Sequence, residues 1–104
     1  MNLLNDTLIK SIPALYATEN IKDPLVQCKF FTPDNSWSWY VLEYDKDNKI
    51  FFGYVSGLDN ELGYFSLDEL ESYISSSQLK IKRDIYFTPT KLSDIKRLCN
   101  DRDS

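Results

Sequence analysis

The chain has 104 residues, of which 42% are hydrophobic and 27% are charged, and its formal net charge is −4. This length predicts one domain spanning residues 1–104, and no apolar run is long enough to cross a membrane. The chain contains no histidine, which excludes Ser-His and Cys-His catalysis and most zinc or iron sites.

Two cysteines and the start of the chain indicate the cellular compartment. Cys28 and Cys99 are far apart in the sequence, and the first residues lack the basic and apolar segments of a secretory signal. We therefore expect two separate, reduced thiols. The chain is expected to be cytoplasmic and to hold neither a metal nor a cofactor.

The beginning of the chain predicts a short helix followed by irregular structure. Asp6 is the expected N-cap of a helix over residues 7–12, which Pro13 ends because the residue before a proline disfavours helical dihedrals. Residues 15–24 have no helix or strand period and contain their own turn residues. We expect them to form a loop.

Aromatic residues concentrate in the middle of the chain and predict a sheet. Most of the two tryptophans, seven tyrosines and six phenylalanines lie between residues 30 and 65, and such residues favour pleated structure. Four strands are expected, over residues 25–31, 37–44, 50–55 and 61–65. In the first strand, Val26, Cys28 and Phe30 would share one face. Gly53 indicates a bulge or a close approach of another backbone.

The second of these strands carries large apolar groups on both faces. Strict alternation puts Glu43 on the same face as Val41, and Tyr44 on the opposite face. Because each face of the sheet is apolar, both need a cover. We expect helices and terminal segments of the same chain to supply it.

The last third of the chain predicts two helices and an edge strand. Ser66 and Glu69 have the spacing of a capping box, which begins a helix over residues 67–75. Its expected inward side chains are Leu67, Leu70, Tyr73 and Ile74. Residues 84–88 could add an edge strand, and a helix over residues 91–99 would bury Leu92, Ile95, Leu98 and Cys99. The whole is an α+β domain with an antiparallel meander of about four strands.

A protein-binding surface is the leading functional interpretation. Residues 43–71 carry eight acidic residues against two lysines, and aromatic side chains with a polar rim are typical of protein interfaces. The candidate partner contacts are Trp37, Trp39 and Tyr40, with Asp45, Asp47, Asp59 and Glu61 as the acidic rim.

Two alternatives stay open. A nucleic-acid-binding surface would use the basic residues Lys80, Lys82, Arg83, Lys96 and Arg97, although phosphate contact favours a basic surround and the aromatic block is acidic. A carboxylate-and-metal enzyme would use Glu43, Asp45 and Glu61.

An ordered set of motifs resembles a family of small bacterial proteins of unknown function that plasmids and other mobile elements often carry. The motifs are LYATE (15–19), KFFTPD (29–34), WSWY (37–40), FFG (51–53), ELGYFSLDELE (61–71) and RDIYF (83–87). They define a core over about residues 15–93. One departure is Lys82, where the resemblance leads us to expect an acidic residue, and residues 99–104 form a variable tail.

The resemblance brings no catalytic residues to this chain. It implies an accessory gene that serves maintenance, transfer or evasion of host defence. We therefore expect a non-catalytic module that binds a protein partner, such as a host defence or nucleic-acid-processing component. The sequence favours no particular oligomeric state.

Overall fold

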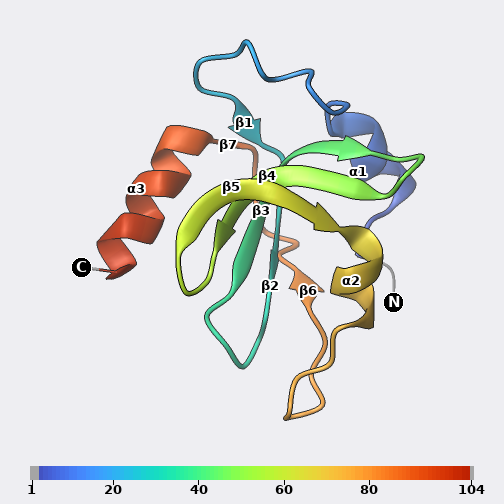
Figure 1. Cartoon of the computed structure of the whole chain (residues 1–104), viewed down its shortest axis with the longest axis vertical. Coiled ribbons are helices and arrows are strands. Elements are labelled where there is room, and N and C mark those ends of the chain that lie inside the picture. The colour runs from blue at the N-terminus through green and yellow to red at the C-terminus, as the bar shows by residue number, and fades with distance from the viewer. Residues whose placement is uncertain (1–2, 104) are drawn as a thin grey trace.

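A five-stranded antiparallel sheet forms the centre of the protein, in the order β5-β4-β3-β2-β6. The computed structural model describes residues 3–103, and the side chains of residues 3–100 (Figure 1). The strands of this sheet are β2 (Cys28–Phe31), β3 (Ser38–Asp45), β4 (Ile50–Ser56), β5 (Asn60–Ser66) and β6 (Lys82–Arg83). The predicted α+β class and antiparallel meander are confirmed.

Three helices and a small second sheet complete the part of the fold that the structure describes. The helices are α1 (Asp6–Ser11), α2 (Leu67–Ser72) and α3 (Leu92–Asp103), and β1 (Leu25–Val26) pairs with β7 (Thr90–Lys91). Figure 1 shows α3 on one side of the sheet and α1 and α2 on the other side of the view. No helix among residues 3–103 is both long and apolar enough to cross a membrane.

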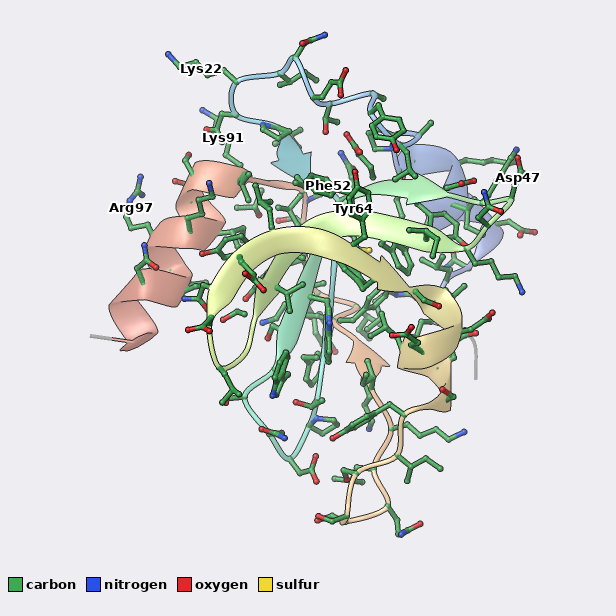
Figure 2. The ribbon with its side chains drawn as sticks, viewed as in Figure 1. Lys22, Asp47, Phe52, Tyr64, Lys91 and Arg97 are labelled. Carbon is green, nitrogen blue, oxygen red and sulfur yellow. The ribbon has the colours of Figure 1, made fainter. Side chains whose placement is uncertain are left out.

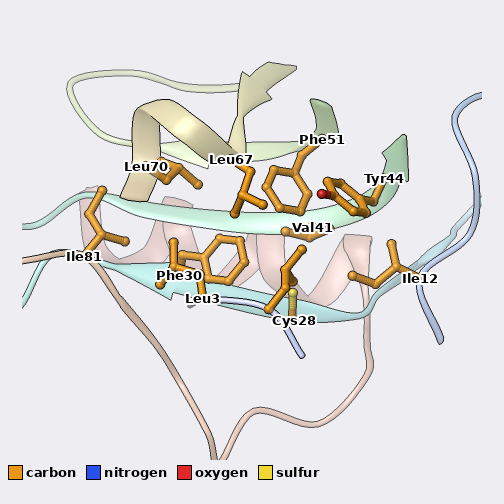
Figure 3. Close-up of a cluster of buried hydrophobic side chains, with 11 residues drawn as sticks. Leu3, Ile12, Cys28, Phe30, Val41, Tyr44, Phe51, Leu67, Leu70 and Ile81 are labelled. Atoms are coloured by element: carbon orange, nitrogen blue, oxygen red, sulfur yellow. The ribbon is translucent and has the colours of Figure 1, made fainter. Parts of the chain in front are cut away.

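The sheet buries one cluster of side chains on each of its faces. On the face that α2 covers, which we call the α2 face, Phe51 stacks on Tyr44 with ring centroids 4.5 Å apart (Figure 3). On its other side, Phe51 stacks on Phe65 with centroids 5.2 Å apart. On the opposite face, the α3 face, Tyr40 and Leu42 pack against α3. The chain itself therefore covers the buried cluster on each face, whereas Leu62 and Tyr64 on the α3 face stay exposed.

A bulge in β3 changes the expected alternation of side chains. Val41 pairs with Gly53, but Glu43 is the next residue to pair, with Phe52, so Leu42 is the extra residue. An extra residue shifts the faces of all later ones. Tyr44 consequently joins Val41 on the α2 face, and the prediction for Glu43 and Tyr44 was wrong.

Gly53 lies opposite this bulge, which confirms the irregularity predicted at this residue. A Cβ atom at Gly53 would collide with the backbone carbonyl oxygen of Tyr40. A Cβ atom at Gly63, its neighbour in β5, would meet no heavy atom within 4 Å. The close approach of two backbones therefore requires glycine at position 53 but not at position 63.

The first predicted strand is interrupted at Gln27. Val26 belongs to β1 and packs into the α3-face cluster, whereas Cys28 and Phe30 belong to β2 and the α2-face cluster. The single face expected for these three residues was wrong because β1 pairs with β7 rather than within the main sheet.

Four other expectations need correction at the ends of elements. Asn5, not Asp6, caps α1, because its side chain accepts a hydrogen bond from the Leu8 amide. The capped helix α2 begins after Ser66 as predicted but ends at Ser72, which leaves Ile74 exposed. The edge strand is Lys82–Arg83 rather than 84–88, and Leu98 faces outward from α3.

The two glycines form a matched pair for a stability test. We expect Gly53→Ala to lower the free energy of unfolding by about 3 kcal/mol, because its methyl group displaces the β3 backbone. Gly63→Ala should change it by less than about 0.5 kcal/mol, because the added methyl meets open space. Urea unfolding measures both, and equal effects would contradict the close approach at Gly53.

The cysteines lie on opposite faces of the sheet and are confirmed as separate free thiols. Burial raises the pKa of Cys28 from 9.0 to about 12, so its thiol stays protonated and unreactive. We expect neither cysteine to react with a thiol reagent at about pH 8 in the folded protein, and both to react after unfolding. Rapid labelling of the native protein would contradict this burial.

Candidate functional site

The two tryptophans lie together at one end of the sheet. Trp37 and Trp39 are half-buried, and their rings stack with centroids 6.0 Å apart. Gly57 lies directly beneath Trp37, where a Cβ atom would collide with the indole ring. Tyr73 joins the tryptophans around a hollow of about 240 Å³. This hollow is too small for more than one side chain of a partner.

Two of the predicted rim residues lie near the tryptophans. Trp39 pairs with Val55, which pairs with Glu61, so these three residues form one row on the α2 face. Asp59 lies in the adjoining β4–β5 turn, next to Gly57. The structure therefore brings Trp37, Trp39, Asp59 and Glu61 to the same end of the sheet.

The other predicted contacts lie elsewhere. Tyr40 is 1% exposed and belongs to the α3-face core, so it is not part of the surface. Asp45 closes the β3–β4 turn by accepting hydrogen bonds from the Asn48 amide side chain at 2.8 Å and from the Asp47 backbone at 3.0 Å. The side-chain bond from Asn48 is the main cause that lowers the pKa of Asp45. Asp47 lies at the tip of this turn, at the opposite end of β4 from Trp37 (Figure 2).

The carboxylates of the metal hypothesis are also separated. Glu61 is on the α2 face and Glu43 is buried on the α3 face, whereas Asp45, the last residue of β3, directs its carboxylate to Asn48 in the β3–β4 turn. Within the part of the chain that the structure describes, no three histidine, cysteine, aspartate or glutamate residues could together hold a metal ion.

The basic residues of the nucleic-acid hypothesis divide between two elements. Lys82 and Arg83 form β6, and Lys80 precedes them, whereas Lys96 and Arg97 are on α3. β6 is the edge strand next to β2, and Figure 1 shows α3 well apart from it. Arg83 donates a hydrogen bond to the Leu3 carbonyl oxygen at 2.6 Å, and Arg97 pairs with Asp94 at 3.1 Å.

Four exposed apolar side chains surround a cleft on the α3 face. This cleft, which we call the loop–sheet cleft, has a volume of about 420 Å³ and lies between the 15–24 loop, β4, β5 and the start of α3. Its exposed apolar residues are Tyr16 (62%), Ile21 (53%), Leu62 (43%) and Tyr64 (58%). Lys22, Lys96 and Glu19 supply its polar rim.

Aromatic rings of β4 and β5 form the floor of the cleft. Figure 2 shows Phe52 and Tyr64 beneath the 15–24 loop, and their ring centroids are 5.0 Å apart. Partial desolvation is the main cause that raises the pKa of Tyr64, and the neighbouring Tyr16 hydroxyl adds to it. Tyr64 therefore keeps its phenol proton across the physiological range.

Glu43 fixes the first half of the loop over the sheet. Its side chain is buried, with 3% of the residue exposed, and it accepts hydrogen bonds from the backbone amides of Tyr16 and Thr18, each at 2.9 Å, and from the Thr18 hydroxyl. Tyr16 has a φ of 69°, a left-handed conformation that a bulky residue adopts only when its surroundings stabilise it. The bulge in β3 is what points Glu43 toward the loop.

Asp23 fixes the second half of the loop to α3. Its carboxylate accepts hydrogen bonds from the Ser93 amide at 2.9 Å and the Ser93 hydroxyl at 2.7 Å, and the hydroxyl bond is the main cause that lowers the pKa of Asp23. The Leu92 amide also donates to the Pro24 carbonyl oxygen at 2.9 Å. The wall of the cleft is thus held at both ends.

These observations define a small α+β domain with an apolar surface cleft. The chain belongs to the family described as "Protein of unknown function (DUF2958)", whose model matches residues 3–103. No curated protein and no solved structure matches the chain. The family membership agrees with the resemblance and assigns no activity.

The loop–sheet cleft was not predicted from the sequence. Leu62 and Tyr64 are two residues apart in a predicted strand, so the sequence already indicated that they share one face of the sheet. The position of Tyr16 and Ile21 over that face had no local signal, because it depends on hydrogen bonds to Glu43, which is distant in the sequence.

A single substitution tests the role of Glu43. We expect Glu43→Gln to lower the free energy of unfolding by about 2 kcal/mol, because the amide replaces one charged acceptor by a donor. Glu61→Gln, a matched change on the exposed part of β5, should change it by less than about 0.5 kcal/mol. Equal unfolding curves for the two variants would contradict an anchoring role for Glu43.

Proposed function

We propose that this protein is a non-catalytic, cytoplasmic interaction module, encoded by a mobile-element or accessory gene, that binds a partner protein through the loop–sheet cleft. The observation that carries the proposal is the set of four exposed apolar residues, Tyr16, Ile21, Leu62 and Tyr64, around one cleft. A host defence or nucleic-acid-processing protein is the partner class that the family resemblance favours.

The chemistry of the cleft supports binding to a protein. Tyrosines supply large contact area with little loss of side-chain entropy, and a few apolar residues in a central pocket give most of the energy of typical interfaces. The volume of about 420 Å³ suits one or two apolar side chains of a partner. Lys22, Lys96 and Glu19 then provide the polar rim that such interfaces have.

The anchored loop supports the same proposal. Glu43 and Asp23 hold the loop before any partner arrives, so association need not order it. A preformed site loses less conformational entropy on binding. The nucleic-acid alternative has weaker support, because Lys80, Lys82 and Arg83 lie in or just before β6, whereas Lys96 and Arg97 are on α3.

A matched pair of isoleucine variants tests this proposal. The full chain, immobilised, should retain a protein from a bacterial host lysate, and Ile21→Lys should weaken binding of the purified partner at least tenfold, which is about 1.4 kcal/mol. Ile85→Lys makes the same change at an exposed site between β6 and β7 and should leave binding unchanged. Ile21 is a better probe than Trp39, which packs against the α2-face core.

Two results would count against the proposal. One is the absence of any retained protein, and the other is an equal effect of the two isoleucine variants. Circular dichroism of each variant confirms that the fold is intact before binding is compared.

A further inference from the structure

Strand β5 is a long, free edge of the sheet. It spans seven residues and, among residues 3–103, pairs only with β4, whereas the strand at the other edge, β6, has two residues. A long edge strand exposes a row of backbone groups that can pair with another strand. Natural proteins protect such edges by shortening them, as at β6, or by prolines, lysines and bulges.

The hydrogen-bonding phase of β5 identifies which backbone groups point outward. The Leu67 amide donates to the Lys49 carbonyl oxygen, and the Gly57 amide donates to the Asp59 carbonyl oxygen. Bonded and non-bonded pairs alternate along an antiparallel ladder, and the β4–β5 register has no shift. Leu62 and Tyr64 therefore direct their N–H and C=O groups away from β4.

The middle of this edge has none of the usual protective features. Residues 60–66 contain no proline and no lysine, and their one charged residue is Glu61. Leu62 and Tyr64 are exposed, and the space over Gly63 on the α2 face is open. The backbone at this position is accessible to a second strand.

We propose that β5 pairs in antiparallel orientation with β5 of a second copy of this chain, with the two-fold axis at Gly63. In this register, Leu62 and Tyr64 of one copy face Tyr64 and Leu62 of the other and exchange backbone hydrogen bonds. Gly63 faces Gly63 in a non-bonded pair, where the backbones approach most closely. This inference does not depend on the proposed function.

The register centred on Gly63 pairs all seven residues of β5 with those of the second copy, and the residues that meet in it are compatible. Glu61 lies opposite Phe65, and Asn60 lies opposite Ser66, so no like charges meet. A register centred on Glu61 would place two glutamates directly opposite each other, which is unfavourable. Registers centred on Leu62 or Tyr64 leave residues at one end of the strand unpaired.

Pairing of β5 would also change the loop–sheet cleft. Side chains opposite each other in a ladder share one face of the sheet, so Tyr64 of the second copy would lie beside Leu62 at the edge of the cleft. The five-stranded sheets of the two copies would become continuous. Each copy would thus add an aromatic residue to the cleft of the other.

The first experiment measures mass by sedimentation equilibrium with the full chain. We expect the wild-type protein to have twice the mass of one chain, and the double variant Leu62→Lys with Tyr64→Lys to have the mass of one, because four lysines would meet across the edge. The control, Leu98→Lys with Tyr86→Lys, makes the same changes at exposed sites outside β5 and should remain a dimer. A monomeric wild type, or a dimeric edge variant with intact fold, would overturn the proposal.

The second experiment reads the register by single cysteine substitutions. Across a non-bonded antiparallel pair the Cα atoms are about 4.5 Å apart, which permits a disulfide. We expect Gly63→Cys to form a cross-linked dimer under mild oxidation, while Leu62→Cys and Tyr64→Cys do so at least about tenfold more slowly. The native cysteines are buried and should not interfere. Faster cross-linking through residue 62 or 64, or none through residue 63, would overturn the register.

Discussion

The hydrogen bonds that Glu43 accepts from the 15–24 loop depend on a single irregularity in the sheet. Leu42 is an extra residue in β3, opposite the close approach of Gly53 to the Tyr40 backbone. Without the bulge, alternation would point the Glu43 side chain into the α2-face core, where a carboxylate would have to lose its hydration without a partner. With it, the carboxylate meets the amides of Tyr16 and Thr18, and the loop gains a fixed position.

The same bulge explains how a sheet with apolar residues on both faces is covered by a short chain. Before the bulge, Tyr40 faces α3, and after it Tyr44 faces the N-terminal segment and α2. One strand therefore supplies aromatic packing to both layers. The 15–24 loop then covers the part of the α3 face that α3 does not reach, although Tyr64 stays more than half exposed. The cleft is the remaining gap between these two covers.

Local patterns in the sequence predicted the helices and strands of the fold well, but not the breaks and bulges within them. The turns, the capping box at Ser66 and the strands β3 to β5 follow from residue type and period, which act over a few residues. The break at Gln27 and the bulge at Leu42 result from tertiary pairing, which overrides alternation. For the same reason, Trp37 and Trp39 could be identified as neighbours from one strand, whereas the loop residues of the cleft could not.

The cleft and the free edge of β5 are not independent features. The register with β4 gives Leu62 and Tyr64 both outward backbone groups and side chains on the α3 face. Any strand that pairs with this edge must place alternate side chains beside the cleft, because side chains of paired strands align across the ladder. A partner that fills the cleft therefore lies next to the free backbone of β5. In the proposed dimer, pairing at the edge would therefore change the affinity of the cleft for a partner, because both use Leu62 and Tyr64.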